Sequence, residues 1–135
     1  MTEDPKKHPD QVARRRILVV DDEDSVARAV VEILKAHGFD ASAVNDPTEV
    51  PQRVAEFHPN LIILDFDMPK LLGPDLAVLL KSRSETREIP VVFLSGMTDE
   101  DHHTIGTFSG AAAYLDKPVD PPKLIETIRA LLIDA

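Results

Sequence analysis

Short runs of aliphatic residues recur along this chain, and each run stops at a polar or charged residue. The clearest run covers residues 61–64; turn-forming residues bound it, and it ends at Asp65. Continuous aliphatic runs of this length are typical of strands that are buried on both faces of a parallel sheet. The pattern therefore predicts a buried strand that carries Asp65 at its carboxyl end.

Similar runs at residues 17–20, 41–44, 91–94 and 112–115 predict four more strands. The segments between the runs place apolar residues at helical spacing and predict helices. In the first of these segments, Asp24 or Ser25 is suited to cap a helix and Gly38 to end it. The later segments predict a helix through Leu76, Leu79 and Leu80, a short helix of poor formers within residues 98–110, and a last helix at about residues 120–133.

Five strands alternating with five helices predict an α/β doubly wound sheet, for which right-handed crossovers leave few strand orders. The residues do not determine the order, and the flavodoxin-like (βα)5 arrangement 2-1-3-4-5 is the natural expectation for five units. A chain of 135 residues is the size of a single domain. We expect residues 1–14, which lack periodicity, to form a flexible N-terminal tail, and residues 15–135 to form the domain.

Composition narrows the classes of partner. The net charge of −9 would repel a phosphate backbone, so we expect no direct contact with nucleic acid. The chain contains no cysteine, which excludes a disulfide framework and a thiolate metal site. No stretch is apolar for long enough to cross a membrane or to serve as a signal-peptide core. We therefore expect a cytoplasmic location and no membrane partner.

Chemically active residues follow four of the five predicted strands. In the expected strand order, the first and third strands are neighbours at the point where ligands bind to such sheets. Three carboxylates in one crevice repel each other unless a hard cation lies among them, and oxygen ligands of this kind suit Mg²⁺. The residues are Asp21 and Asp22 after the first strand, Asp65 after the third, Ser95 after the fourth and Lys117 after the fifth.

Such a set has the chemistry of phosphoryl transfer. A hydroxyl and an ammonium beside the cation would complete a phosphate cradle, and one aspartate would be the nucleophile that forms an acyl phosphate. We assign this role to Asp65, which stands alone at the centre of the edge. Taken singly, Asp21 and Asp22 can be read as helix-capping acids, Ser95 as a turn residue and Lys117 as a solvated loop residue. Their coincidence on four strand ends favours a site.

The motifs that carry these residues resemble the receiver domain of two-component response regulators. The resemblance covers about residues 15–134. In order along the chain, the matching motifs are Ile-Leu-Val-Val-Asp21-Asp22, Leu-Asp65-Phe-Asp-Met-Pro69 with Gly73, Leu-Ser95-Gly, and Tyr114-Leu-Asp-Lys117-Pro118.

The resemblance implies that Asp65 accepts a phosphoryl group from a histidine kinase or a histidine phosphotransfer protein. It implies a Mg²⁺ ion, or Mn²⁺, bound directly by Asp22, Asp65 and the backbone carbonyl of Asp67, with Asp21 binding mainly through water. Such a domain is a phosphoacceptor that catalyses its own phosphotransfer and dephosphorylation, and it is not otherwise an enzyme.

The resemblance also implies a switch. Ser95 and Lys117 would contact the phosphoryl oxygens, and Tyr114 would turn inward as the Ser95 hydroxyl moves. The Lys117–Pro118 peptide bond would be cis. The fourth helix, fifth strand and last helix would then signal to a downstream protein, and the same face is where a homodimer would form.

Two departures from the family pattern concern the output face and the context of the domain. The fourth helical segment contains His102 and His103, for which a pair of solvated side chains is a simpler reading than a metal or phosphohistidine site. No effector domain follows residue 134, so the chain is either a stand-alone receiver or a fragment of a longer regulator.

Two other classes of function fit parts of the sequence. Asp65-Phe66-Asp67 resembles the nucleophile and acid pair of haloacid-dehalogenase-like phosphatases, but that family needs a further acidic pair downstream of Lys117 on another strand. Its nucleophile also normally lies on the first strand. A phosphorylation-independent interaction domain would not need the acids, the hydroxyl and the lysine together.

Overall fold

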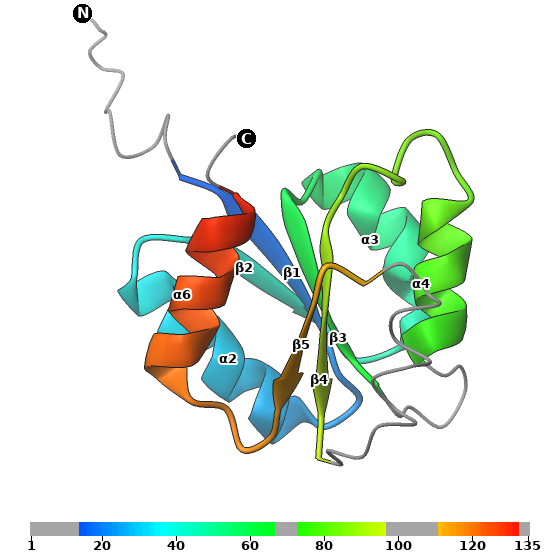
Figure 1. The fold of residues 1–135 in the computed structure, drawn as a ribbon. Helices are drawn as coiled ribbons and strands as arrows, with labels where there is room; N and C mark the ends of the chain where they lie inside the picture. The colour runs from blue at the N-terminus through cyan, green and yellow to red at the C-terminus, as the bar shows by residue number, and fades with distance from the viewer. Residues whose placement is uncertain (1–13, 67–72, 97–110, 133–135) are drawn as a thin grey trace, which may run out of the picture.

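The protein folds around one parallel sheet with helices on both faces, as its computed structural model shows (Figure 1). The structure describes residues 14–66, 73–96 and 111–132. The strand order β2-β1-β3-β4-β5, with every neighbouring pair parallel, confirms the predicted flavodoxin-like doubly wound fold. The strands are β1 (Arg16–Val20), β2 (Asp40–Val44), β3 (Leu61–Asp65), β4 (Val91–Ser95) and β5 (Ala113–Asp116).

The helices cover the two faces in pairs. Helices α2 (Asp24–Ala36) and α6 (Pro121–Leu131) lie on one face, and α3 (Val50–Phe57) and α4 (Gly73–Lys81) lie on the other (Figure 1). A short 3₁₀ turn, η1 (Pro47–Glu49), precedes α3. The helix expected within residues 98–110 and most of the expected N-terminal tail lie outside the described residues. None of the helices described is long and apolar enough to pass through a bilayer.

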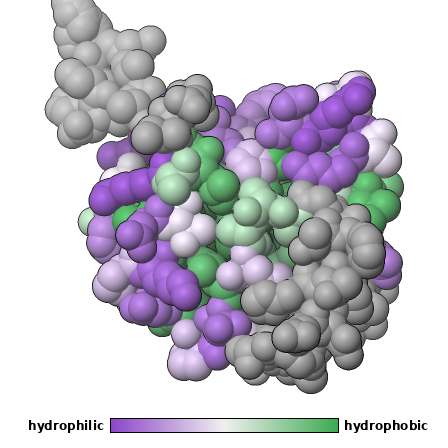
Figure 2. Space-filling view, viewed as in Figure 1, coloured by the Kyte–Doolittle hydropathy of each residue, from purple (hydrophilic) through white to green (hydrophobic). Residues whose placement is uncertain are grey.

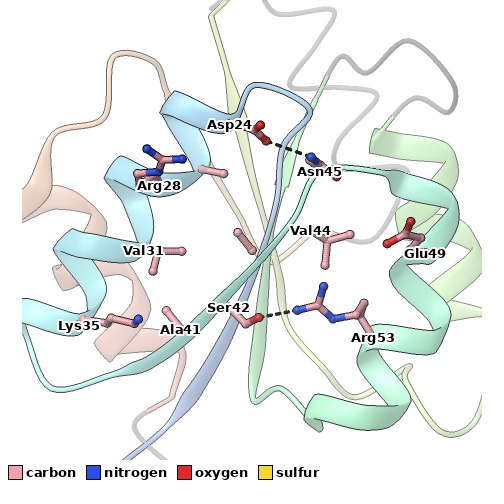
Figure 3. Close-up of a pocket in the computed structure, with 12 residues that line it drawn as sticks. Asp24, Arg28, Val31, Lys35, Ala41, Ser42, Val44, Asn45, Glu49 and Arg53 are labelled. Atoms are coloured by element: carbon pink, nitrogen blue, oxygen red, sulfur yellow. Dashed lines mark hydrogen bonds between the residues drawn. The ribbon is translucent and has the colours of Figure 1, made fainter.

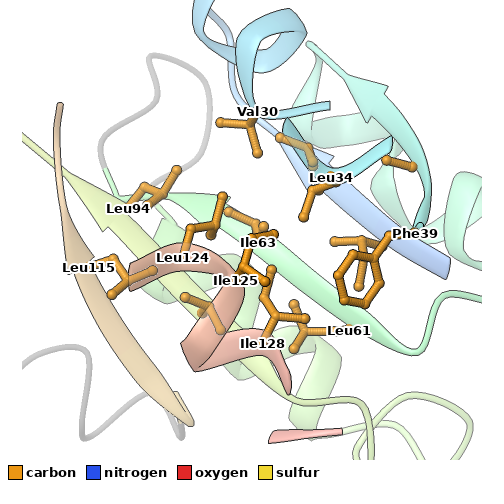
Figure 4. Close-up of a cluster of buried hydrophobic side chains, with 14 of the residues drawn as sticks. Val30, Leu34, Phe39, Leu61, Ile63, Leu94, Leu115, Leu124, Ile125 and Ile128 are labelled. Carbon is orange, nitrogen blue, oxygen red and sulfur yellow. The ribbon is translucent and has the colours of Figure 1, made fainter. Parts of the chain in front are cut away.

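Burial on both faces explains why β3 and β4 are continuously apolar. Every residue of these two strands is buried, Asp65 and Ser95 included. On one face, Val30 and Leu34 of α2 and Leu124 and Ile128 of α6 pack over Ile63 (Figure 4). A matching cluster under α3 and α4 contains the side chains of alternate strand residues, because successive strand residues point to opposite faces. Figure 2 shows apolar residues gathered over the β5 edge of the sheet, with polar residues around them.

The ends of α2 differ in part from the expectation. Neither Asp24 nor Ser25 is the N-cap; Glu23 takes that position without a side-chain cap, and its backbone N–H donates to Asp21 Oδ1 at 2.9 Å. The expected end at Gly38 is confirmed, because this residue has a φ of 91°, which glycine adopts without strain.

The predicted helix through Leu76, Leu79 and Leu80 is present as α4, but Leu79 does not belong to its buried face. Leu79 is 37% exposed, and the core contacts of the helix come from Leu76, Ala77 and Leu80. A run of neighbouring leucines leaves the inward face ambiguous when only the sequence is read.

Candidate functional site

The predicted site residues lie at the carboxyl ends of the strands, where the backbone ties neighbouring strand ends together. The N–H of Asp21 donates to the Val44 carbonyl at 3.1 Å, and the N–H of Phe66 donates to the Leu94 carbonyl at 2.8 Å. A third hydrogen bond, 2.7 Å long, joins the Lys117 N–H to the Ser95 carbonyl. The sheet therefore fixes the positions from which the functional side chains extend.

Three carboxylates meet at this edge. Asp21, Asp22 and Asp65 each offer an oxygen, and these oxygens lie within 4.8 Å of one another. Asp21 is 1% exposed and Asp65 is 5% exposed, whereas Asp22 is open to solvent. Hard divalent cations prefer clustered carboxylate oxygens, and the exposed side leaves room for water or a phosphate oxygen. These residues fit a Mg²⁺ site.

Lys117 supplies the positive charge of the cluster. Its Nζ lies 3.1 Å from Asp21 Oδ2 and 3.1 Å from Asp65 Oδ1, to which it donates a hydrogen bond. Glu23, which sequence reasoning did not include in the site, lies on the exposed side with its Oε1 at 3.9 Å from the same nitrogen. The ammonium therefore joins the ends of β1, β3 and β5.

The electrostatics of the cluster favour the protonated forms of Asp65 and Lys117, because both pKa values are raised. Burial, and then the negative charge of Asp21, raise the pKa of Asp65 to about 7, against an opposing effect of Lys117. Burial lowers the pKa of Lys117, but the carboxylates of Asp21 and Asp65 outweigh it and leave that pKa raised. A bound cation would act on Asp65 in the same direction as Lys117, because positive charge favours the ionised and nucleophilic carboxylate.

Ser95 and Tyr114 lie next to this edge. Ser95, the last residue of β4, is 1% exposed. Tyr114 is half-buried with a buried hydroxyl, and its ring centroid lies 5.7 Å from that of Phe66 and 6.1 Å from that of Phe93. The structure thus places Tyr114 beside the rings of Phe66 and Phe93, which sequence reasoning did not include in the site.

The remaining expectations for the site have mixed outcomes. The Lys117–Pro118 peptide bond is cis, as the resemblance implied. Asp67, whose backbone carbonyl was expected to bind the metal, lies outside the described residues, and so do His102 and His103.

A separate hollow lies along the open edge of β2. Its volume is about 450 Å³, and residues of α2, β2 and α3 line it (Figure 3). A 2.6 Å hydrogen bond from Arg53 to Ser42 crosses between α3 and β2, and Asn45 donates to Asp24 at 3.1 Å near the start of α2. Charged side chains of this kind discourage pairing of an open strand with another chain. Of the lining residues, none belongs to the carboxylate cluster.

Comparison with known proteins agrees with the fold. Residues 17–129 match the response regulator receiver domain family. The chain is 37% identical over 119 residues to the DNA-binding response regulator MtrA of Mycobacterium tuberculosis, covering 88% of this chain and 51% of that protein. It is 36% identical over 118 residues to the phosphate regulon transcriptional regulatory protein PhoB of Escherichia coli, covering 87% of this chain and 52% of that protein.

Solved structures show the same architecture. A putative response regulator from Chloroflexus aurantiacus superposes with a TM-score of 0.85 at 26% identity, covering 89% of this chain and 98% of that one. The chemotaxis protein CheY4 of Vibrio cholerae superposes with a TM-score of 0.83 at 25% identity, covering 88% of this chain and 99% of that one.

A doubly wound sheet with acids, a buried serine and a lysine at its strand ends agrees with a receiver domain, which is a signalling domain rather than a classical enzyme. The chain belongs to the response regulator receiver domain family of two-component systems. It spans about half the length of the curated relatives that it matches. The DNA binding in the name of MtrA is a property of that longer protein.

Proposed function

We propose that Asp65 accepts a phosphoryl group from a histidine kinase or a histidine phosphotransfer protein. A carboxylate oxygen of Asp65 attacks phosphorus, the bond from phosphorus to the donor histidine nitrogen breaks, and an acyl phosphate forms. The observation that carries this assignment is the position of Asp65: it is buried at the centre of the strand-end edge, with the Lys117 ammonium at 3.1 Å. The reaction is a stoichiometric transfer and not a turnover of substrate.

The acids would hold Mg²⁺ or Mn²⁺, with Asp22 and Asp65 as direct ligands and Asp21 acting mainly through water. When bound, the metal offsets the negative charge that gathers at the transferring phosphoryl group. We assign the Asp67 carbonyl as a further ligand by resemblance to the family.

Lys117 and Ser95 bind the phosphoryl oxygens once the acyl phosphate has formed. The ammonium that now pairs with Asp21 and Asp65 is close enough to reach an oxygen added to Asp65. The Ser95 hydroxyl then moves toward the phosphoryl group, and Tyr114 responds as the switch. The face that contains β5 and α6 carries the signal to a downstream protein, or to a second copy of the chain.

The acidic composition supports signalling through protein contact. With a net charge of −9, this chain does not itself contact DNA, even if a longer protein that contains it does. We further propose that residues 15–135 act as one receiver unit and that residues 1–14 are a tail.

Phosphorylation by a small phosphodonor with Mg²⁺, followed by intact-protein mass spectrometry, tests the function. The wild type should gain one phosphoryl group per chain, and Asp65→Asn should gain none. Asp40→Asn is the matched control, because Asp40 is exposed at the opposite end of the strands and should leave uptake unchanged. Sustained hydrolysis of a phosphate monoester, which the self-dephosphorylation of a receiver does not produce, would favour a phosphatase. No uptake from the small phosphodonor would favour a phosphorylation-independent interaction domain.

A further inference from the structure

Among the described residues, three aromatic rings form one cluster: one ring just after β3, one on β4 and one on β5. The rings of Phe66 and Phe93 meet edge to face, with centroids 5.4 Å apart and planes at 76°. Tyr114 completes the cluster, with its centroid 5.7 Å from Phe66 and 6.1 Å from Phe93. Tilted and edge-to-face pairs at these distances are favourable aromatic arrangements. We refer to Phe66, Phe93 and Tyr114 as the aromatic cluster.

Phe66 connects this cluster to the phosphoacceptor. It follows Asp65 in the chain, and because strand side chains alternate, the carboxylate of Asp65 and the ring of Phe66 extend to opposite faces of the sheet. The ring is 4% exposed and belongs to the core under α3 and α4.

Phe66 also lies beside Ser95. The register pairs Asp65 with Leu94, so the next position on each strand brings Phe66 opposite Ser95. The 2.8 Å hydrogen bond from the Phe66 N–H to the Leu94 carbonyl holds this arrangement. One residue is thus bonded covalently to Asp65, lies opposite Ser95 and contacts the ring of Tyr114.

We propose that Phe66 is the positioning residue that couples a phosphoryl group on Asp65 to the position of Tyr114. The inference rests on the proposed function and adds a specific route to it. A shift of the β3 end displaces the ring of Phe66, and a close-packed interior transmits that displacement to the ring in contact with it. An aliphatic side chain fills part of the space but lacks the flat face and edge that orient Tyr114.

The chain contains its own reporter for this coupling. Tyr114 is its single tyrosine, so 3-fluorotyrosine labelling gives one ¹⁹F resonance that reports on this ring alone. The variants are Phe66→Leu and, as a matched control, Phe57→Leu. Phe57 of α3 packs against the same core without belonging to the aromatic cluster.

The experiment compares the labelled 135-residue chain and its variants before and after phosphorylation by a small phosphodonor with Mg²⁺. Mass spectrometry gives the phosphorylated fraction, which should be equal in the wild type, Phe66→Leu and Phe57→Leu. The ¹⁹F resonance should shift on phosphorylation in the wild type and in Phe57→Leu, and Phe66→Leu should lose most of that shift. A merely structural role would lower the stability of both variants and leave both shifts intact.

Two outcomes would overturn the inference. A wild-type shift that persists undiminished in Phe66→Leu overturns the role of Phe66 alone and leaves the phosphoacceptor assignment standing. A wild type that takes up no phosphoryl group overturns the proposed function together with the inference. If Phe66→Leu does not fold, Phe66→Met provides the same test, because its flexible side chain fills more of the space and still lacks a ring.

Discussion

Replacing Asp65 with asparagine should stabilise the metal-free protein by an amount that depends on pH. The side chain keeps its shape, but the charge that is expensive to bury beside Asp21 is removed. Burial and Asp21 raise the pKa of Asp65 from 3.8 to about 7 in the folded protein. Between these two values the folded state holds a proton that the unfolded state has released, so the stability of the wild type falls as pH rises through this window.

The magnitude follows from the width of the window. Each pKa unit corresponds to about 1.4 kcal/mol, so the ionised carboxylate costs the fold about 4 kcal/mol above pH 7. From about pH 5 to about pH 8 the wild type should lose about 3 kcal/mol through this one group. Asp65 is 5% exposed, so water screens this cost little. The asparagine variant has no carboxyl group to titrate at this position. Its stability advantage over the wild type should therefore grow by the same amount over this pH range.

Urea unfolding in the presence of a metal chelator measures this advantage at several pH values. Asp40→Asn serves as the control and should track the wild type throughout, because Asp40 is exposed at the opposite end of the sheet. A difference between Asp65→Asn and the wild type that stays constant from about pH 5 to about pH 8 would refute the reasoning. It would mean that Lys117 fully compensates the charge of Asp65 in the folded protein.

Three further predictions concern the same edge of the sheet. Mg²⁺ at a hundredfold excess over its dissociation constant should stabilise the wild type by about 3 kcal/mol. Thermal melts should show that Asp22→Ala abolishes this effect and raises the stability of the metal-free protein. An unchanged Mg²⁺ effect in the variant would remove Asp22 from the metal ligands. Lys117→Ala should lower the free energy of unfolding by about 3 kcal/mol near pH 8, where the anionic Asp65 loses its partner. The loss should be smaller near pH 5, where Asp65 is protonated and the lost contact with Asp21 accounts for most of the effect. Equal losses in urea titrations at both pH values would show that Asp65 does not contribute to the pairing. Ser95→Ala should still take up a phosphoryl group on Asp65. Phosphorylation should change hydrogen exchange around Tyr114 clearly in the wild type and not in this variant. An equal response in both proteins would show that the Ser95 hydroxyl does not drive the switch.

The sequence alone was sufficient to locate the site at the strand ends. Buried strands such as β3 need an unbroken apolar run, so the first polar residue after each run marks the edge where a parallel sheet binds ligands. Asp65 and Lys117 were therefore found from local pattern, although 52 positions separate them in the chain. The strand order could not be read from local pattern, because it depends on long-range packing. It was expected by analogy to other folds of five units.

Other features depend on contacts that no local pattern encodes. Ala29 and Leu79 fit an apolar helical stripe but are exposed, because the sheet beneath each helix selects which part of a broad stripe is covered. The aromatic cluster requires the register of β3, β4 and β5 together, so Phe66 reads in the sequence as one more core residue. In the sequence, Glu23 is one acid in a run of acids. Only its distance to Lys117 in the folded protein places it near the site.

The order of synthesis determines when the ion pair between Lys117 and the acids can form. Synthesis proceeds from the N-terminus, so the strands that carry Asp21, Asp22 and Asp65 leave the ribosome well before the residue that balances their charge. A sheet formed from the first four strands alone would gather three mutually repelling carboxylates without that ammonium. Pairing of β5 with β4 brings the Lys117 ammonium to 3.1 Å from both Asp21 and Asp65, so the last strand to be synthesised completes the sheet and also offsets part of the negative charge at its edge.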